Sequence, residues 1–247
     1  MIDILDCPSP NHDARADGSP IDMLVLHYTG METGEAALAR LRDPAAKVSA
    51  HYVVEEDGRV FRLVPESRRA WHAGVSFWRG HRDINSRSIG IELVNPGHEF
   101  GYRDFPPAQM AALIRLIRDI MARHSIPPRN VVGHSDVAPT RKADPGERFD
   151  WSLLARNGIG LWPFDNPAPV PPDRLPWADT DLTRVGMAQR LLAVYGYDVP
   201  QTNVLDDATR CVLVAFQRHF RPACIDGDLD SETFARLKTL VLSVSCD

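Results

Sequence analysis

The sequence predicts a mixed α/β sheet flanked by helices, followed by a small all-α domain of three helices. In the first two thirds of the chain, short apolar runs alternate with amphipathic segments, which is typical of strands interleaved with helices. A proline-rich segment follows, and beyond it only helical periodicity recurs. We therefore predict a first domain at residues 1–162, a linker at 163–177 and a helical domain at 178–247.

The elements of the first domain are predicted from runs of apolar residues and from the glycines and prolines that end them. Two β-rich runs flank Asp57-Gly58, which is a hairpin signal. The clearest helix begins at Pro107, because proline is tolerated in the first turn, and ends before Pro127. Strands are expected at residues 23–27, 50–54, 59–64, 88–94 and 130–134, and helices at 34–42 and 107–124.

The C-terminal part differs in composition, with a proline-rich segment followed only by helical patterns. Residues 163–176 contain six prolines in fourteen positions, which fixes φ and removes backbone donors, so an extended linker is expected. Three helical patterns follow at 183–195, 206–220 and 231–242. Asp206 and Ser231 stand just ahead of two of these patterns and are good N-cap residues.

Composition excludes several classes of protein. The 28 Lys and Arg against 33 Asp and Glu give a net charge of -5, so no nucleic-acid footprint is expected. No apolar run reaches the ~18 residues that span a bilayer. The polar start, residues 1–18, does not resemble a signal peptide, so we expect a cytoplasmic protein, or an envelope protein if an export segment is missing. A monomer is the default expectation.

Two histidines stand at the ends of predicted strands, His27 after 23–26 and His134 at the end of 130–134. The loop that follows His134 carries two carboxylates, Asp136 and Asp144, and either could join the histidines. Two imidazoles and one carboxylate, with a fourth position left open, are the ligand set of a catalytic zinc ion. The four cysteines form no CxxC pair, so a cysteine-based zinc site is not expected.

Other polar residues lie where they could serve such a site. Glu92 interrupts the apolar strand 88–94, where alternation places it on one face with Gly90 and Val94. There it pairs with a charge, binds a metal or acts as a base with a raised pKa, unless it is simply an outward-facing surface carboxylate. Lys142, two residues before Asp144, could stabilise a developing oxyanion or could be a solvated loop lysine.

A tryptophan and a histidine adjoin a glycine in the segment Trp71-His72-Ala73-Gly74. The pair Trp71 and His72 could contact a sugar or a peptide, or could pack in the core beside a turn.

Taken together, these segments resemble the type-2 N-acetylmuramoyl-L-alanine amidases, the superfamily that includes the peptidoglycan recognition proteins, and most closely its AmpD/AmiD-like branch. The matches span almost all of residues 20–163 in family order. They are LHYTG (26–30), VSAHYVVEEDGRVFRLVPE (48–66), AWHAG (70–74), NSRSIGIELVN (85–95), VVGHSDVAPTRKADPG (131–146) and GIGLWP (158–163).

The resemblance implies a role for each candidate. His27, His134 and Asp144 match the ligands of one catalytic Zn2+, so Asp144 is preferred to Asp136. Glu92 and Lys142 match the catalytic glutamate and lysine. The implied reaction is metal-assisted hydrolysis of the amide between N-acetylmuramic acid, or its 1,6-anhydro form, and L-alanine. A peptidoglycan sensor without turnover is the alternative, while other zinc hydrolases are disfavoured because HExxH and HxHxD strings are absent.

The last domain resembles the helical peptidoglycan-binding repeat, so peptidoglycan or muropeptide fragments are the expected partners. The matches are MAQRLL (187–192), YGY (195–197), VAFQ (214–217) and IDG (225–227). One departure is the segment 220–224, which replaces the usual short connection before the Asp-Gly turn. The domain is therefore expected either to bind glycan or to pack against the first domain.

Overall fold

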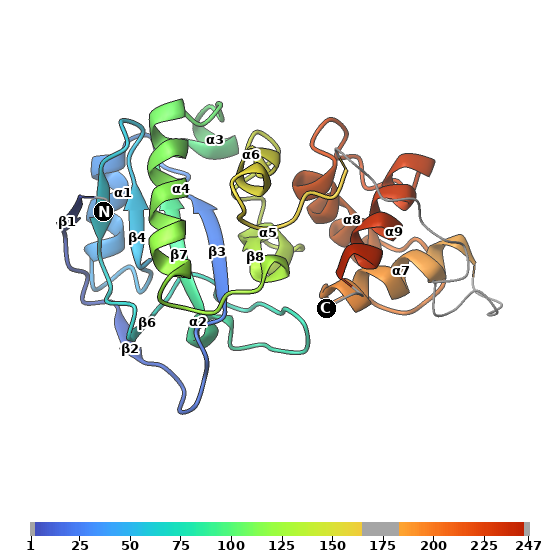
Figure 1. Ribbon diagram of the computed structural model, residues 1–247, viewed down its shortest axis with the longest axis horizontal. Helices are drawn as coiled ribbons and strands as arrows, with labels where there is room; N and C mark the ends of the chain where they lie inside the picture. The colour runs from blue at the N-terminus through green and yellow to red at the C-terminus, as the bar shows by residue number, and fades with distance from the viewer. Residues whose placement is uncertain (1–2, 165–182, 245–247) are drawn as a thin grey trace.

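The computed structural model describes residues 3–164 and 183–244 (Figure 1). The strands are β1 (Ile4–Asp6), β2 (His12–Ala14), β3 (Met23–Tyr28), β4 (Tyr52–Val54), β5 (Val60–Arg62), β6 (Arg68–Ala70), β7 (Ser88–Leu93) and β8 (Val131–Gly133). The helices are α1 (Gly34–Arg42), α2 (Ile84–Arg87), α3 (Gly97–Phe100), α4 (Pro107–Met121), α5 (His134–Val137), α6 (Trp151–Arg156), α7 (Arg184–Tyr195), α8 (Asp207–Phe220) and α9 (Ser231–Val244). The predicted linker, beyond residue 164, lies outside the described residues.

Six strands form the main sheet in the order β1-β5-β4-β7-β3-β8. The four strands β4, β7, β3 and β8 run parallel, while β5 is antiparallel to β4 and parallel to β1. This mixed sheet with flanking helices is the predicted fold class, which is confirmed. Because the central strands are parallel, their carboxyl ends share one edge of the sheet, and loops leaving that edge can meet there.

The two faces of the sheet are covered differently. On one face Leu24, Ile89 and Ile91 pack against α4, which Figure 1 shows lying in front of the sheet. On the other face Val53 and Val94 pack with Leu41 of α1. The alternation predicted for β7 is confirmed, so Gly90 and Glu92 share the face opposite α4.

Most predicted elements are confirmed, with two corrections. The Asp57-Gly58 hairpin joins β4 to β5, and Pro107 is the first residue of α4. Asp206 caps α8 as expected, but the cap expected from Ser231 is wrong, because Asp230 accepts from the Thr233 N–H (2.8 Å) and Ser231 already lies in α9. The three-residue strands β1, β2 and β6 were not predicted, since segments so short carry little periodicity.

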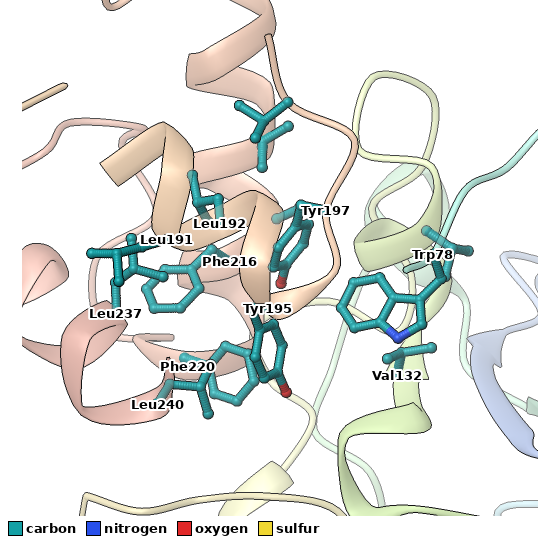
Figure 2. Packing of buried hydrophobic residues seen from close by; sticks show 14 of the residues in the cluster. Trp78, Val132, Leu191, Leu192, Tyr195, Tyr197, Phe216, Phe220, Leu237 and Leu240 are labelled. Atoms are coloured by element: carbon teal, nitrogen blue, oxygen red, sulfur yellow. The ribbon is translucent and has the colours of Figure 1, made fainter. Parts of the chain in front are cut away.

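The three helices α7, α8 and α9 gather at one end of the molecule, beside α5 and α6 (Figure 1). One continuous apolar cluster joins them to the α/β part. Figure 2 shows Trp78 and Val132 of the α/β part facing Tyr195 and Tyr197, with Phe216 and Phe220 behind. The Trp78 ring meets the rings of Tyr195 and Tyr197 edge-on, at 5.6 and 5.1 Å between centroids. The helical part therefore packs on the α/β part through a shared core.

Among the described residues, the structure has neither a paired cysteine nor a helix that could span a membrane. Cys7, Cys211 and Cys224 are free thiols. Within residues 3–164 and 183–244, no helix combines the length and the apolar character needed to cross a membrane.

Candidate functional site

The candidate site lies at the carboxyl edge of the parallel strands, on the face opposite α4. His27 is near the end of β3 and is the register partner of Glu92 on β7. Register partners on neighbouring parallel strands project to the same face, so the imidazole and the carboxylate lie side by side. His134 follows β8 directly and is the first residue of α5. Three neighbouring strands thus deliver three polar side chains to one place.

The predicted ligands converge. His27 Nδ1 lies 2.9 Å from Asp144 Oδ2 and 3.0 Å from His134 Nδ1, and His134 Nδ1 lies 3.0 Å from the same oxygen. All three side chains are buried. Among the residues that the structure describes, these three form a cluster that could hold a metal ion, because their ligand atoms all lie within 4.8 Å of one another.

The loop that presents Asp144 is held from both sides. The Ser135 N–H donates to the Asp144 carbonyl at 2.9 Å, and Tyr102 Oη donates to the Pro145 carbonyl at 2.7 Å. Gly133 is required where this loop crosses β8, because a Cβ there would lie 2.7 Å from Pro145 Cδ. Gly146, at φ +84°, allows the close approach of the Tyr102 hydroxyl. These contacts fix Asp144 opposite the two histidines.

The electrostatics suit metal binding. Burial, followed by the neighbouring His134, lowers the pKa of His27 to about 4, although Asp144 opposes this shift. Burial acts to raise the pKa of Asp144, but His134 and His27 outweigh it and hold that pKa well below its usual range. At neutral pH the site therefore offers a neutral His27 imidazole and an ionised Asp144 carboxylate, the protonation states that a metal ligand requires.

The donor set can be tested against zinc. Zn2+ takes imidazole nitrogen and carboxylate oxygen at about 2.0–2.2 Å, so two ligand atoms of a tetrahedral ion lie about 3.3 Å apart. The observed separations of 2.9–3.0 Å are within a few tenths of an ångström of that value. With three protein ligands, a tetrahedral ion keeps one position for substrate or water. The residues therefore fit a catalytic zinc ion.

Glu92 borders the cluster without belonging to it. Its Oε2 is buried and finds no hydrogen-bond partner among the described residues. Burial, reinforced by the negative charge of Asp144, raises the pKa of Glu92 well above its usual value, while Lys142 opposes the shift. A carboxylate with a raised pKa can both take and return a proton near neutral pH. Lys142 lines the same cleft and its side chain is exposed.

A cleft of about 720 Å³ opens over these groups. Trp71 and His72 both line it, but they differ in exposure and in hydrogen bonding. Trp71 is half-buried, whereas His72 is 9 % exposed and has both ring nitrogens engaged, Nδ1 with His27 and Nε2 with Ser88. Arg40 and Arg141 also line the cleft and were not singled out in the sequence, because isolated arginines give no signal.

Asp136, the competing carboxylate, points away from the histidine pair. It accepts hydrogen bonds from the Gly133 N–H at 2.7 Å, the Tyr197 hydroxyl at 2.6 Å and His219 Nδ1 at 2.7 Å. The last two donors belong to the helical part. Asp136 is therefore a structural anchor between the two parts, and the geometry agrees with the choice of Asp144 for the cluster.

The sequence matches the family described as N-acetylmuramoyl-L-alanine amidase over residues 17–147, about half of the chain. The chain belongs to the N-acetylmuramoyl-L-alanine amidase family. A second match, to a peptidoglycan binding domain, covers residues 182–237. The resemblance found in the sequence is thus confirmed, and an amidase activity follows from the family.

Individual relatives agree with this assignment. The amidase AmiD of Escherichia coli (strain K12) is 42% identical over 241 residues, covering 92% of this chain and 85% of the relative. Its structure with the substrate anhydro-N-acetylmuramic acid-L-Ala-D-gamma-Glu-L-Lys superposes with a TM-score of 0.77 at 40% identity, over 94% of this chain and 93% of that one. AmpDh3 of Pseudomonas aeruginosa, in complex with an anhydromuramic pentapeptide, gives a TM-score of 0.74 at 36% identity, over 91% and 93%.

Proposed function

We propose that this amidase hydrolyses the amide bond between N-acetylmuramic acid, or its 1,6-anhydro form, and the L-alanine of the stem peptide, and that it uses one zinc ion held by His27, His134 and Asp144. One observation carries the proposal. A carboxylate with a raised pKa, Glu92, lies in register with one member of a two-histidine, one-aspartate cluster, inside a cleft. That combination supports metal-assisted hydrolysis, because it offers ligands for a metal ion and, beside them, a group that can carry a proton.

The chain's own residues have separate tasks. When bound, zinc would polarise the scissile carbonyl and lower the pKa of water at the site. Glu92 takes the proton from the attacking water and delivers it to the departing amine of L-alanine, so that no free amide anion has to form. Lys142 places a positive charge near the oxygen on which negative charge develops. The bond that breaks is the amide C–N bond, and the new C–O bond gives a lactyl carboxylate.

The cleft supports a muropeptide as the substrate. Its volume of about 720 Å³ lies within the ~300–1,000 Å³ typical of small-molecule sites. We propose that Trp71 stacks on the sugar or on the peptide, and that Arg40 pairs with a stem-peptide carboxylate. Both AmiD and AmpDh3 have been seen with anhydro-muropeptides. Parallel digestion of an anhydro-muropeptide and of intact sacculi would measure the preference between fragment and polymer.

We also propose that the chain divides functionally near its proline-rich segment, with residues 1–162 forming the amidase domain and residues 178–247 a peptidoglycan-binding domain. The second family match supports this division. The shared apolar cluster supports a fixed arrangement of the two domains. A pull-down of the full chain with intact sacculi, in excess chelator to suppress cleavage, would test the binding.

The variant Glu92→Gln tests the catalytic assignment. We expect the rate of stem-peptide release from an anhydro-muropeptide to fall by about 10²–10⁴, the usual contribution of a general acid–base. Zinc content should stay near one ion per chain, because Glu92 is not among the three ligands. Glu99→Gln is the matched control, since Glu99 lines the same cleft and should keep most of the rate.

Two results would contradict the proposal. If Glu92→Gln keeps a rate near that of the unmodified protein, Glu92 is not the proton carrier. If the unmodified, zinc-loaded protein binds the muropeptide but mass analysis finds no free stem peptide, the protein is a sensor rather than an enzyme.

A further inference from the structure

Two adjacent residues of one loop, His72 and Ala73, contact both histidines of the cluster on the side away from Asp144. We propose that the His72 ring and the Ala73 carbonyl are positioning groups that hold His27 and His134 in the tautomer with an unprotonated Nδ1. This inference deepens the proposed zinc site and rests on it. It assigns a role to the Trp71-His72-Ala73-Gly74 segment other than contact with substrate.

The contact to His134 is direct. His134 Nε2 lies 3.1 Å from the Ala73 carbonyl oxygen. A carbonyl oxygen can only accept, so Nε2 must carry the proton. A neutral imidazole has one N–H, which leaves Nδ1 of His134 with a free lone pair directed at Asp144 Oδ2.

The tautomer of His27 follows from a series of hydrogen bonds that starts at the Ile84 carbonyl and runs through Ser88 and His72. The Ser88 hydroxyl donates to the Ile84 carbonyl at 2.7 Å, so its oxygen accepts from His72 Nε2 at 3.1 Å. His72 therefore carries its proton on Nε2, and its Nδ1 is an acceptor. That acceptor lies 3.0 Å from His27 Nε2, which must then be the protonated nitrogen of His27. The Ile84 carbonyl therefore sets the direction of every hydrogen bond in this series.

The loop itself is held in place by residues of α2 and β7. Asn85 Oδ1 accepts from the backbone N–H groups of His72 and Ala73, at 3.1 and 2.8 Å. The His72 ring lies directly over Gly90, where a Cβ would come within 2.5–2.6 Å of the ring atoms. Gly90 is therefore needed for the close approach of His72 to β7. Because one loop carries both positioning groups, the two histidines are oriented together.

The consequence concerns the cluster before any metal binds. With both Nδ1 atoms unprotonated, three lone pairs converge at separations of 2.9–3.0 Å with no proton between the two histidines. Such a cluster is already in the form that accepts a divalent cation, so no tautomer has to change on binding. Outer partners of metal-bound histidines typically contribute 10–100-fold to metal affinity.

The first test is spectroscopic and uses the unmodified full chain. Long-range 1H–15N correlation spectra of the zinc-free, 15N-labelled protein distinguish the two neutral tautomers of each histidine. We expect His27, His72 and His134 all to show protonated Nε2 and unprotonated Nδ1. A spectrum with a proton on Nδ1 of His27 or of His134 would overturn the inference.

The second test measures zinc affinity by competition with a chromophoric chelator. Ser88→Ala removes the acceptor of His72 Nε2, so His72 can change tautomer and turn an Nδ1–H towards the Nε2–H of His27. We expect the dissociation constant for zinc to rise 10–100-fold. Ser9→Ala is the matched control, because the buried Ser9 hydroxyl also donates to a backbone carbonyl, that of Leu41, but contacts no histidine. Its zinc affinity should not change.

A pair of variants at His72 makes the test specific. His72→Asn keeps an oxygen near the position of Nδ1 and should retain more zinc affinity than His72→Ala, which leaves His27 Nε2 without its acceptor. If Ser88→Ala and His72→Ala, both folded by circular dichroism, each lose less than tenfold in zinc affinity, the positioning role is wrong. If instead the unmodified protein binds no zinc, it is the proposed function that fails, so the two outcomes are distinguishable.

Discussion

Replacing Asp136 with alanine should destabilise the whole protein, because this carboxylate holds the helical part to the α/β part. The Asp136 side chain is 1 % exposed and accepts three hydrogen bonds, from the Gly133 N–H, the Tyr197 hydroxyl and His219 Nδ1. Alanine would leave all three donors without an acceptor in a buried place. Each unsatisfied donor costs about 1–3 kcal/mol.

These costs do not simply add, because neighbouring groups relax together and water can enter. Removing one partner of a buried charged group typically costs about 3–5 kcal/mol, which we take as the expected loss in the free energy of unfolding. For a chain of this size, 1 kcal/mol lowers the melting temperature by about 2–4 °C, so a fall of roughly 6–20 °C is expected.

Urea denaturation followed by circular dichroism and by tryptophan fluorescence would measure this loss. Tyr197→Phe deletes only one of the three donors and should cost about 1–2 kcal/mol. Asp104→Ala is the control, because Asp104 also pairs with an arginine but its side chain is 82 % exposed, and such pairs contribute about 0–1 kcal/mol. If Asp136→Ala is no more destabilising than the control, the anchoring role is refuted.

Three further outcomes are expected. Lys142→Met should lower the turnover of a muropeptide by about 10–10³ through lost oxyanion stabilisation, with zinc content unchanged by elemental analysis. Chelation of zinc should lower the melting temperature and re-addition should restore it, because stabilisation by a bound ligand grows with the logarithm of its free concentration and reaches about 2.7 kcal/mol at 100 times the dissociation constant. Burial would raise the pKa of Glu66, but hydrogen bonds from Arg123, Tyr52 and His124 lower it to about 2. The stability from Glu66 is therefore present above its usual pKa of 4.5 and lost as the pH falls from there towards 2. Glu66→Gln should accordingly cost up to about 3 kcal/mol at pH 7 and progressively less in acid, as measured by urea titrations across that range.

The sequence was sufficient for the elements whose periodicity is long or whose ends are marked. Helix α1 and the start of α4 were predicted to the residue, because apolar spacing and a first-turn proline are local signals. The N-cap of α9 was misplaced by one residue, since Asp230 and Ser231 are both good caps and only the backbone conformation chooses between them.

At the site, the residues at strand ends could be predicted from the sequence, but the contacts between distant segments could not. His27 and His134 stood out because each follows an apolar run, but spacing alone could not choose between Asp144 and Asp136. The choice depends on which way each carboxylate faces, and Asp136 faces Tyr197, 61 residues away in the chain. The positioning role of His72 was missed for the same reason, since it depends on Asn85 and Ser88 from a later helix and strand.

The register between β3 and β7 has a consequence for how this chain can change in length. Side chains alternate along a strand, so inserting or deleting one residue between Ser88 and Glu92 would exchange the two faces of β7. The carboxylate would then be buried beneath α4, and Ile91 or Leu93 would enter the cleft beside His27. In these five positions, only a change by an even number of residues would keep the carboxylate on the same face as His27.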